Sequence, residues 1–354
     1  MSMIKVIKIL SFIFVPIYYL IISVRNFLFD IGIFKSLGVN AKVISIGNIV
    51  VGGSGKTPFV IYISKLLKTL GWKPSVLSRG YGRKTKGYLL VSADGKSIAD
   101  VEKCGDEIYQ TVMECEVPAA VCERRIEGAV KLLKEVDSDI IVLDDAFQHR
   151  WLKRNLDLVL IDKTFLTNKS IFIQSLLPAG LMREPLSSIK RASAIILNKK
   201  FSNDDHLTLE NLLKKFNKPV FTAYYKAISF VDMTRKTEHS LEDFNGQDSL
   251  VISGIANPHS FLSILAKTGV TTKNQLIFKD HKHYTTKEVE QIRKTFYSTN
   301  AHSVVTTKKD AVKLLKFARE FDDIDIFYLK IELCIENEEK FIEFLKNNLI
   351  NHHN

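Results

Sequence analysis

The chain has 354 residues, and 50 lysines and arginines against 39 aspartates and glutamates give it a formal net charge of +11. This length favours two domains over one hydrophobic core, and the positive charge favours a polyanionic partner, which could be nucleic acid, an anionic membrane or a phosphorylated substrate. The four cysteines have no C-x-x-C spacing, which argues against a zinc site or a disulfide framework and favours a reducing cytoplasm.

An apolar run near the N-terminus, at residues 9–24, predicts an element that meets lipid. Tyrosines lie within it and basic residues flank it, as suits a membrane interface. A spanning helix needs about 20 apolar residues, and this run is shorter and is interrupted by Pro16. We therefore expect residues 1–35 to form a helix that lies on the membrane. A signal peptide and a buried core helix are the alternatives, but no small-residue cleavage site follows.

The segment VGGSGKT at residues 51–57 has the setting of a phosphate-binding loop. An expected strand (42–51) precedes it and an expected helix (58–67) follows it. Glycines let backbone amides close around phosphate oxygens, Lys56 would reach the β- and γ-phosphates, and Thr57 would offer its hydroxyl to Mg²⁺. The residues expected to bind nucleotide here are Gly52, Gly53, Ser54, Gly55, Lys56 and Thr57.

The loop departs from the usual pattern at one position. Val50 stands where a glycine commonly precedes the lysine by six residues. The loops of partitioning ATPases are similar, but they carry an extra lysine where this chain has Val51. That argues against the partitioning interpretation and leaves an incidental glycine-rich turn as the alternative.

Apolar runs then alternate with helical stretches, a pattern typical of a parallel sheet covered on both faces. The expected strands are residues 75–78, 139–143, 156–161 and 194–197. The expected helices are residues 106–115, 124–136 and 205–216.

The pattern changes at Pro219, where we expect a β-rich linker (219–246) between a first lobe (36–218) and a C-terminal α/β lobe (247–354). The strands expected in the C-terminal lobe are residues 249–253, 303–306 and 324–331. Its expected helices are residues 259–268, 310–321 and 338–349.

Paired acids, Asp144 and Asp145, end the apolar run IIVLDD. A carboxylate in this position holds the Mg²⁺ of a loop-bound nucleotide. Alone, the run would equally suit the N-cap of a helix. Together with the glycine loop, it predicts a site for ATP and Mg²⁺.

Nine elements in chain order resemble the tetraacyldisaccharide 4′-kinases, also called lipid A 4′-kinases. They are the N-terminal apolar helix, GNIVVGGSGKTP, SRGYGR, GDE, DDAFQH, LLPAGLMREP, SGIANPHSF, FKDHKHY and TTKKDAVKL. The resemblance spans nearly the whole chain. It implies an α/β fold, with a P-loop NTPase-like α/β/α lobe, a smaller α/β lobe and an N-terminal membrane-contacting helix.

The resemblance also implies a reaction. ATP, with Mg²⁺, would give its γ-phosphoryl group to the 4′-hydroxyl of tetraacyldisaccharide 1-phosphate, forming the lipid A precursor lipid IVA in lipopolysaccharide biosynthesis. The implied location is the cytoplasmic face of the inner membrane, peripheral or anchored by the N-terminal helix. The expected partners are this glycolipid and the membrane surface, with no nucleic acid and no obligate protein partner.

By resemblance, Asp106 of GDE is the base that accepts the proton of the sugar hydroxyl, a poor nucleophile near neutral pH. The family pairs this aspartate with a histidine, here His281, for which His283 is a near competitor. Lys56 completes the catalytic set by neutralising charge on the phosphates. Without the resemblance, Asp106 would be interpreted as a helix N-cap and His281 as a surface histidine.

Further site residues are implied by the resemblance. The implied metal ligands are Thr57, Asp144, Asp145 and Glu184. The residues implied near nucleotide or glycolipid phosphate are His149, Tyr81, Arg83 and Arg125. A buried hydrogen-bonded role is the alternative for Glu184 and His149, and a solvated basic surface is the alternative for the other three.

Two positions depart from the family pattern. Ala146 stands where glycine is usual in DDGFQH, and Ile108 stands where proline often follows GDE. The alanine would matter if that backbone needs a positive φ, because alanine is less favourable there than glycine.

Two other functions remain as alternatives. One is a membrane-associated P-loop ATPase that acts on a protein or nucleic-acid partner, and the other is a noncatalytic nucleotide-binding membrane anchor. The first needs no base that activates a hydroxyl, and the second needs no intact set of Lys56, Thr57 and Asp144.

Overall fold

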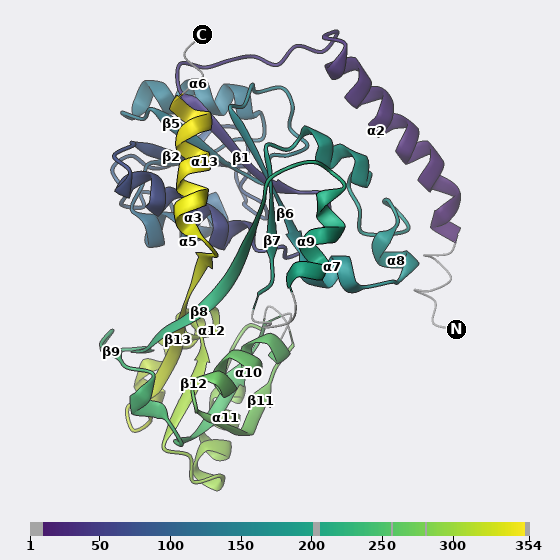
Figure 1. The fold of residues 1–354 in the computed structure, drawn as a ribbon. Coiled ribbons are helices and arrows are strands. Elements are labelled where there is room, and N and C mark those ends of the chain that lie inside the picture. The colour runs from purple at the N-terminus through teal and green to yellow at the C-terminus, as the bar shows by residue number, and fades with distance from the viewer. Residues whose placement is uncertain (1–9, 201–205, 256–257, 280–281, 351–354) are drawn as a thin grey trace. The chain divides into compact units, whose positions relative to one another are not determined.

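The computed structural model describes residues 10–200, 206–255, 258–279 and 282–350, and these form two compact units. Of the described residues, unit 1 holds 10–199, 206–224 and 334–350, and unit 2 holds 200, 225–255, 258–279 and 282–333. The chain passes between them within β8 (Val220–Asp232) and β13 (Ile326–Ile335) (Figure 1).

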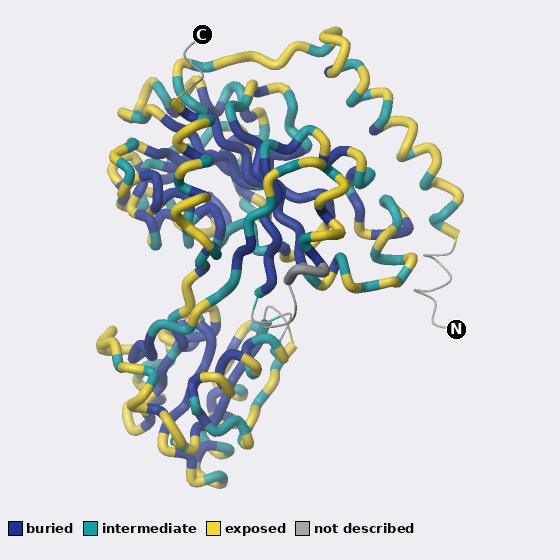
Figure 2. The backbone as a smooth tube through the Cα atoms, in the orientation of Figure 1, coloured by how far each residue is buried: buried dark blue, intermediate teal, exposed yellow. Residues whose placement is uncertain are grey.

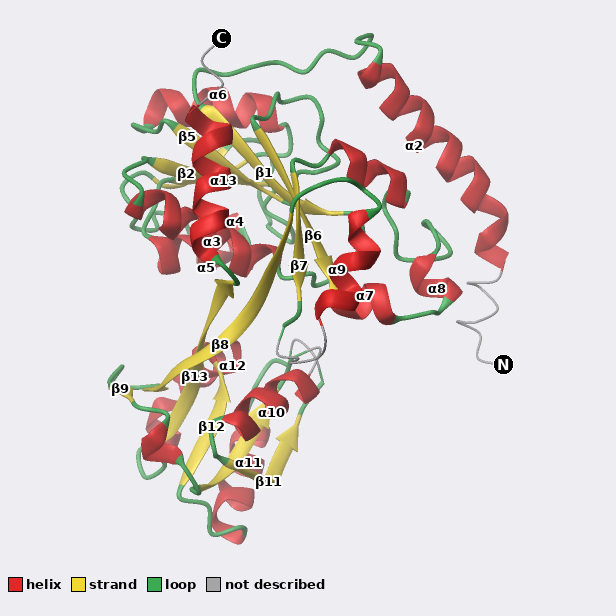
Figure 3. Cartoon of the chain, viewed as in Figure 1, coloured by secondary structure: helices red, strands yellow, loops and turns green. Residues whose placement is uncertain are grey.

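A parallel sheet forms the centre of unit 1, in the order β8-β7-β6-β1-β5-β2-β4-β3, where only β3 runs antiparallel to its neighbour (Figure 3). Its strands besides β8 are β1 (Lys42–Asn48), β2 (Pro74–Ser78), β3 (Leu89–Ser92), β4 (Ala119–Val121), β5 (Ile140–Asp144), β6 (Leu156–Asp162) and β7 (Ala194–Asn198). The central strands are buried along almost their whole length, because helices cover both faces. The predicted α/β fold class is confirmed.

Helices pack around this sheet through two separate apolar clusters, one containing Phe147 and Val159 and the other Val43 and Leu77. The helices of unit 1 are η1 (Phe12–Phe14), α2 (Val15–Asp30), α3 (Lys56–Thr69), α4 (Val101–Cys104), α5 (Asp106–Cys115), α6 (Arg125–Glu135), α7 (Lys163–Thr167), α8 (Ile171–Gln174), η2 (Leu186–Arg191), α9 (His206–Lys214) and α13 (Glu338–Ile350).

Helix α2 is the least buried of the long helices of unit 1. Only Ile22 and Phe29 in it are buried, and Figure 2 shows the rest of the helix as a mixture of exposed and intermediate residues. With η1 it forms a 19-residue stretch, Phe12–Asp30, whose mean hydropathy of 1.8 and length suffice to cross a membrane. Pro16 does not interrupt the helix as predicted, because it lies in the first turn, where a missing amide costs no hydrogen bond.

Unit 2 is a smaller α/β unit with parallel strands in the order β11-β10-β12-β13. Its other elements are β9 (Glu238–His239), η3 (Glu242–Phe244), β10 (Asp248–Ser253), α10 (Pro258–Lys267), β11 (Thr271–Ile277), α11 (Thr286–Ser298), β12 (Ser303–Thr307), α12 (Lys308–Leu314) and η4 (Leu315–Phe321). Apolar clusters around Ile292 and Phe261 cover its sheet.

The compact units differ from the expected lobes in where the last helix belongs. Helix α13 lies in unit 1, although we placed it in the C-terminal lobe. Its Phe341 is fully buried, with its ring 6.3 Å from that of Phe59 and 4.9 Å from that of Phe221. Aromatic packing onto α3 and β8 therefore brings the helix back to unit 1.

The structure of unit 2 differs from the prediction in three places. Helix α11 was missed, although Thr285 and Glu288 form a capping box at its start. Strand β11 was missed because it is an edge strand with mostly polar residues. The single helix expected at residues 310–321 is divided into α12 and η4, with non-helical backbone at Phe317.

Candidate active site

The phosphate-loop sequence lies between β1 and α3, in the predicted setting. Gly55 is the N-cap of α3 with φ +87°, a left-handed conformation that favours glycine. An added Cβ at Gly52 or Gly53 would meet no atom within 4 Å. The loop therefore leaves open space in front of the N-terminus of a 14-residue helix, where phosphate binds well.

Side chains from three strands or loops hold this loop in place. The Asn48 amide donates to the Ser54 hydroxyl at 2.8 Å, and the Asn198 amide donates to the Ser54 carbonyl at 2.9 Å. The Gln148 amide donates to the Asn48 carbonyl at 2.8 Å. Asn48, Ser54 and Asn198 are all buried, so these bonds fix the loop before any ligand binds.

Asp144 ends β5, which pairs with β1, so it lies at the same edge of the sheet as the loop. It is 2% exposed, and its Oδ1 has no hydrogen-bond partner among the described residues. Burial, together with the nearby carboxylates of Glu107 and Asp145, raises its pKa to about 7, although the charges of Lys56 and Arg125 oppose the shift. No helix begins after Asp144, so the N-cap interpretation fails.

Asp145 has a different environment from its neighbour. Lys56 Nζ lies 3.6 Å from its Oδ1, and Arg183 donates to both carboxylate oxygens at 2.8 and 2.9 Å. Burial acts to raise its pKa, but the charges of Lys56 and Arg183 hold the pKa below its usual value. Asp145 is therefore ionised and paired at neutral pH.

The two departures from the family pattern are accommodated. The positive φ in this turn, +49°, falls on Asp145 and not on Ala146, so alanine is not strained there. Ile108 is 1% exposed and packs in the buried face of α5.

Asp106 is the first residue of α5, and Gly105 is the N-cap, so the N-cap interpretation of Asp106 is wrong. Asp106 and Glu107 are both exposed. Because the charge of Glu107 acts on Asp144, the start of α5 faces the acid pair at the end of β5. An added Cβ at Gly105 would lie 2.8 Å from the Tyr81 carbonyl, so the SRGYGR and GDE segments touch.

Arg125 and His149 lie near the end of β5, beside Asp144. Arg125 is 2% exposed and donates to the carbonyls of Cys122 at 2.7 Å and Asp144 at 3.3 Å, and burial lowers its pKa to about 10. Burial and the Arg125 charge lower the pKa of His149 to about 4, so its ring is neutral at physiological pH. Their predicted contacts with phosphate remain predictions.

Arg83 and Tyr81 occupy contrasting environments. The Arg83 guanidinium is buried and pairs with Glu123 at 2.6 Å, whereas Tyr81 is 83% exposed. A solvated basic surface therefore does not describe Arg83 or Arg125, and both assignments near phosphate remain predictions.

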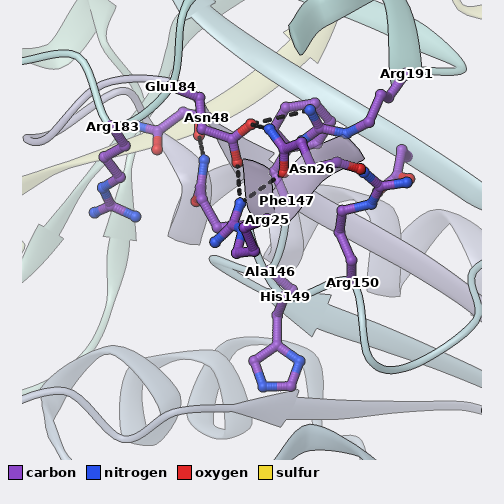
Figure 4. Close-up of polar contacts among 12 residues, drawn as sticks. Arg25, Asn26, Asn48, Ala146, Phe147, His149, Arg150, Arg183, Glu184 and Arg191 are labelled. Atoms are coloured by element: carbon purple, nitrogen blue, oxygen red, sulfur yellow. Dashed lines mark hydrogen bonds and ion pairs between the residues drawn. The ribbon is translucent and has the colours of Figure 1, made fainter. Parts of the chain in front are cut away.

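Glu184 is fully buried, and cationic and amide groups engage both of its carboxylate oxygens (Figure 4). Arg25 lies 3.1 Å from Oε1, and Asn26 and Arg191 lie 3.1 and 2.9 Å from Oε2. This is the buried hydrogen-bonded arrangement that we gave as the alternative. The predicted assistance at the metal is not tested by these contacts and remains a prediction.

The histidine expected to pair with Asp106 lies outside the described residues, since His281 is not among them. His283 is described and is exposed in unit 2. Which of the two histidines pairs with Asp106 therefore stays a prediction, with His281 favoured over His283.

The site fits a nucleotide with Mg²⁺. The open glycine loop suits phosphate, and the unpartnered oxygen of Asp144 suits a hard cation. The described residues contain no group of three or more His, Cys, Asp or Glu that could hold a metal alone. Mg²⁺ needs no such group where nucleotide phosphates, Thr57 and one or two carboxylates supply its ligands.

Sequence reasoning missed several residues that shape this site. Arg183 and Asn198 reach it from 38 and 144 residues away along the chain. The sequence did contain a signal for Asn198, which is the polar residue at the carboxyl end of the apolar strand β7. Ligands of parallel sheets bind at this end of the strands, so a polar residue there is a candidate site residue. Asn48, Gln148 and Arg183 lie inside the family-like elements GNIVVGGSGKTP, DDAFQH and LLPAGLMREP, but no role was predicted for them.

Comparison with known proteins identifies the family. The family model described as tetraacyldisaccharide-1-P 4′-kinase matches residues 7–350. The chain belongs to this family. A tetraacyldisaccharide 4′-kinase of Chlorobium phaeovibrioides is 34% identical over 334 residues, which cover 92% of this chain and 93% of the relative. The enzyme of the same name from Chlorobaculum tepidum is 36% identical over 280 residues, covering 78% of each chain.

A solved structure of the family agrees. The crystal structure of LpxK from Aquifex aeolicus in complex with ATP superposes with a TM-score of 0.77 at 30% identity, covering 97% of this chain and 99% of that chain. The predicted family, fold and enzyme class, a kinase, are confirmed.

Proposed function

We propose that this member of the tetraacyldisaccharide-1-P 4′-kinase family transfers the γ-phosphoryl group of ATP to the 4′-hydroxyl of tetraacyldisaccharide 1-phosphate at the cytoplasmic face of the inner membrane. The observation that carries the proposal is the unpartnered, buried oxygen of Asp144 beside an open phosphate loop. Family membership supports the acceptor, and the exposed apolar helix α2 supports the location.

The residues of unit 1 divide the work. Lys56 and the amides of the loop bind the phosphates, and Thr57 and Asp144 hold Mg²⁺. Mg²⁺, when bound, neutralises charge that develops on the phosphates. As the acceptor oxygen bonds to the γ-phosphorus and the bond to the β-phosphate oxygen breaks, Asp106 takes the hydroxyl proton. Its exposure at the start of α5 leaves it accessible to an acceptor.

The first test is transfer of labelled γ-phosphate to purified tetraacyldisaccharide 1-phosphate in detergent with Mg²⁺. Wild type should form a labelled bisphosphorylated lipid, and Lys56→Ala should lose at least about 10²-fold in rate. Lys65→Ala, an exposed lysine of the same helix, is the matched control and should remain active. Hydrolysis of ATP without labelled lipid would instead support the ATPase.

Asp106 is tested separately from nucleotide binding. Asp106→Asn should lower turnover by about 10²–10⁴-fold, because the amide cannot accept the proton, and should leave ATP affinity near that of wild type. Near-normal turnover would remove Asp106 as the base.

The membrane location is tested by the exposed side chains of α2. Leu20 and Ile21 are 62% and 60% exposed, and replacing both with serine should weaken liposome binding by roughly tenfold or more. These substitutions are sharper than deletion of residues 1–25, which would also remove Arg25 from Glu184. Unchanged liposome binding would exclude α2 as the membrane contact.

A further inference from the structure

The segment at residues 181–184 runs alongside the chain that enters the phosphate loop. Val51 donates its amide to the Leu181 carbonyl at 2.7 Å, and Arg183 donates its amide to the Ile49 carbonyl at 2.7 Å. Val50 and Met182 form an antiparallel bridge between these two bonds. The backbone of residues 181–184 therefore supports the start of the loop directly.

Neighbouring side chains of this segment serve two different sites. The Arg183 side chain points away from Glu184 in Figure 4, and it binds both oxygens of Asp145 beside Lys56. Glu184 points to helix α2, where Arg25 and Asn26 bind it. One dipeptide thus connects the acid pair of the active site with the membrane-facing helix.

A second contact joins α2 to the same dipeptide. The Tyr18 hydroxyl donates to the Arg183 carbonyl at 2.9 Å. Burial of a carboxylate without partners is costly, so Glu184 needs the groups that surround it. If α2 leaves, Glu184 loses Arg25 and Asn26 and keeps Arg191, and the backbone at Arg183 loses Tyr18.

We propose that Arg25 and Asn26 are positioning residues of the nucleotide site, which act through Glu184 and Arg183 on Asp145 and the phosphate loop. The inference rests on the proposed function, in which this site binds Mg²⁺ and ATP. Docking of α2 then increases affinity for the magnesium nucleotide. By linkage, binding of the magnesium nucleotide increases docking of α2 by the same factor.

The first measurement is the affinity of the full-length protein for a non-hydrolysable ATP analogue with Mg²⁺, by calorimetry in detergent. Asn26→Ala should bind about five- to tenfold more weakly than wild type. Asn26→Asp should bind more weakly still, because it places a second negative charge against Glu184. Arg25→Lys, which keeps the charge, should lose less than Arg25→Ala.

Leu20→Ala is the matched control on the same helix. Its side chain is 62% exposed, and its position lies on the opposite side of α2 from Arg25 and Asn26, so nucleotide affinity should equal that of wild type. Equal affinity in all variants would overturn the inference while leaving the proposed function standing. A wild-type protein that binds no nucleotide would overturn the proposed function instead.

The second measurement is hydrogen exchange of the α2 amides with and without the magnesium analogue. In wild type the analogue should slow exchange in α2, and in Asn26→Ala this protection should shrink or vanish. A purely structural role for Asn26 would change exchange equally with and without nucleotide. That outcome would also overturn the inference.

Discussion

In unit 1 the loop after β1 is open, whereas in unit 2 the loop after β10 is already filled by a carboxylate of the same unit. Gly53 has no atom within 4 Å of the position of an added Cβ. Gly254 donates its amide to Asp310 at 2.9 Å, and its added Cβ would lie 3.0 Å from the other Asp310 oxygen. Both loops follow parallel strands, where backbone amides attract anions. We call the site at Gly254 the filled edge, because the Asp310 carboxylate occupies it and stabilises the fold. We call the site at Gly53 the open edge, because it leaves room for an anionic ligand.

The largest expected effect tests the filled edge. Asp310 is fully buried, and its carboxylate accepts hydrogen bonds from Gly254 and Thr307. Asp310→Ala should lower the free energy of unfolding by roughly 2–4 kcal/mol, because both donors lose a buried acceptor. Calorimetry would measure the loss, and faster hydrogen exchange in β10 and β12 would place it in unit 2.

The control for Asp310→Ala is nucleotide affinity, which should stay unchanged in any molecules that remain folded. Weaker binding of the ATP analogue would mean that the two edges are not independent, and the comparison would fail.

The open edge should respond to the same kind of substitution with the opposite sign. Asp144 is buried with an unpartnered oxygen and a pKa of about 7. Asp144→Asn should raise the free energy of unfolding of the metal-free protein by roughly 1–3 kcal/mol at pH 8, because the charge is no longer desolvated. The variant should also lose Mg²⁺-dependent nucleotide binding, and a destabilised variant would contradict this account.

The pH dependence of wild-type stability gives an independent check. The folded protein binds a proton at Asp144 up to about pH 7, whereas the unfolded chain releases it near the ordinary value of 3.8. The contribution of Asp144 to the free energy of unfolding should therefore fall as pH rises from about 4 to about 7. Chemical denaturation across this range should show a slope difference between wild type and Asp144→Asn.

Glu107 sharpens this check, because its charge raises the pKa of Asp144. Glu107→Gln should lower the pKa of Asp144 in the folded protein. The pH range over which the unfolding free energies with and without Asp144→Asn have different slopes should then end at a lower pH. An unchanged upper limit of this range would mean that Glu107 does not act on Asp144.

The smallest expected effect compares the two glycines. Gly254→Ala should lower the free energy of unfolding by about 1 kcal/mol, because its Cβ crowds Asp310 and Tyr284, and should not change nucleotide affinity. Gly53→Ala should leave thermal stability near wild type and weaken binding of the ATP analogue, because the methyl group would occupy the phosphate position. The reverse pattern would refute the distinction between filled and open edges.

Local features of this fold could be predicted from the sequence. Helix α5 was predicted at residues 106–115 and occupies them, and Asp144 lies at the end of its strand as expected. These predictions rest on apolar runs and on breaks between them, which act over a few residues.

Contacts between distant segments could not be predicted. Glu184 meets Asn26 across 158 residues, and α13 returns to α3 from the far end of the chain. Such pairings depend on how complete elements pack, which no local pattern encodes. Resemblance named Glu184 as a site residue, but only the structure shows which groups surround it.

The return of α13 to unit 1 has a consequence for synthesis of the protein. Phe341 packs against Phe59 of the helix that follows the phosphate loop, and both side chains are fully buried. During translation, domains fold as their residues emerge from the ribosome. The nucleotide-binding unit must wait for residues 338–350, so Phe59 of helix α3 lacks its contact with Phe341 until that segment has been made.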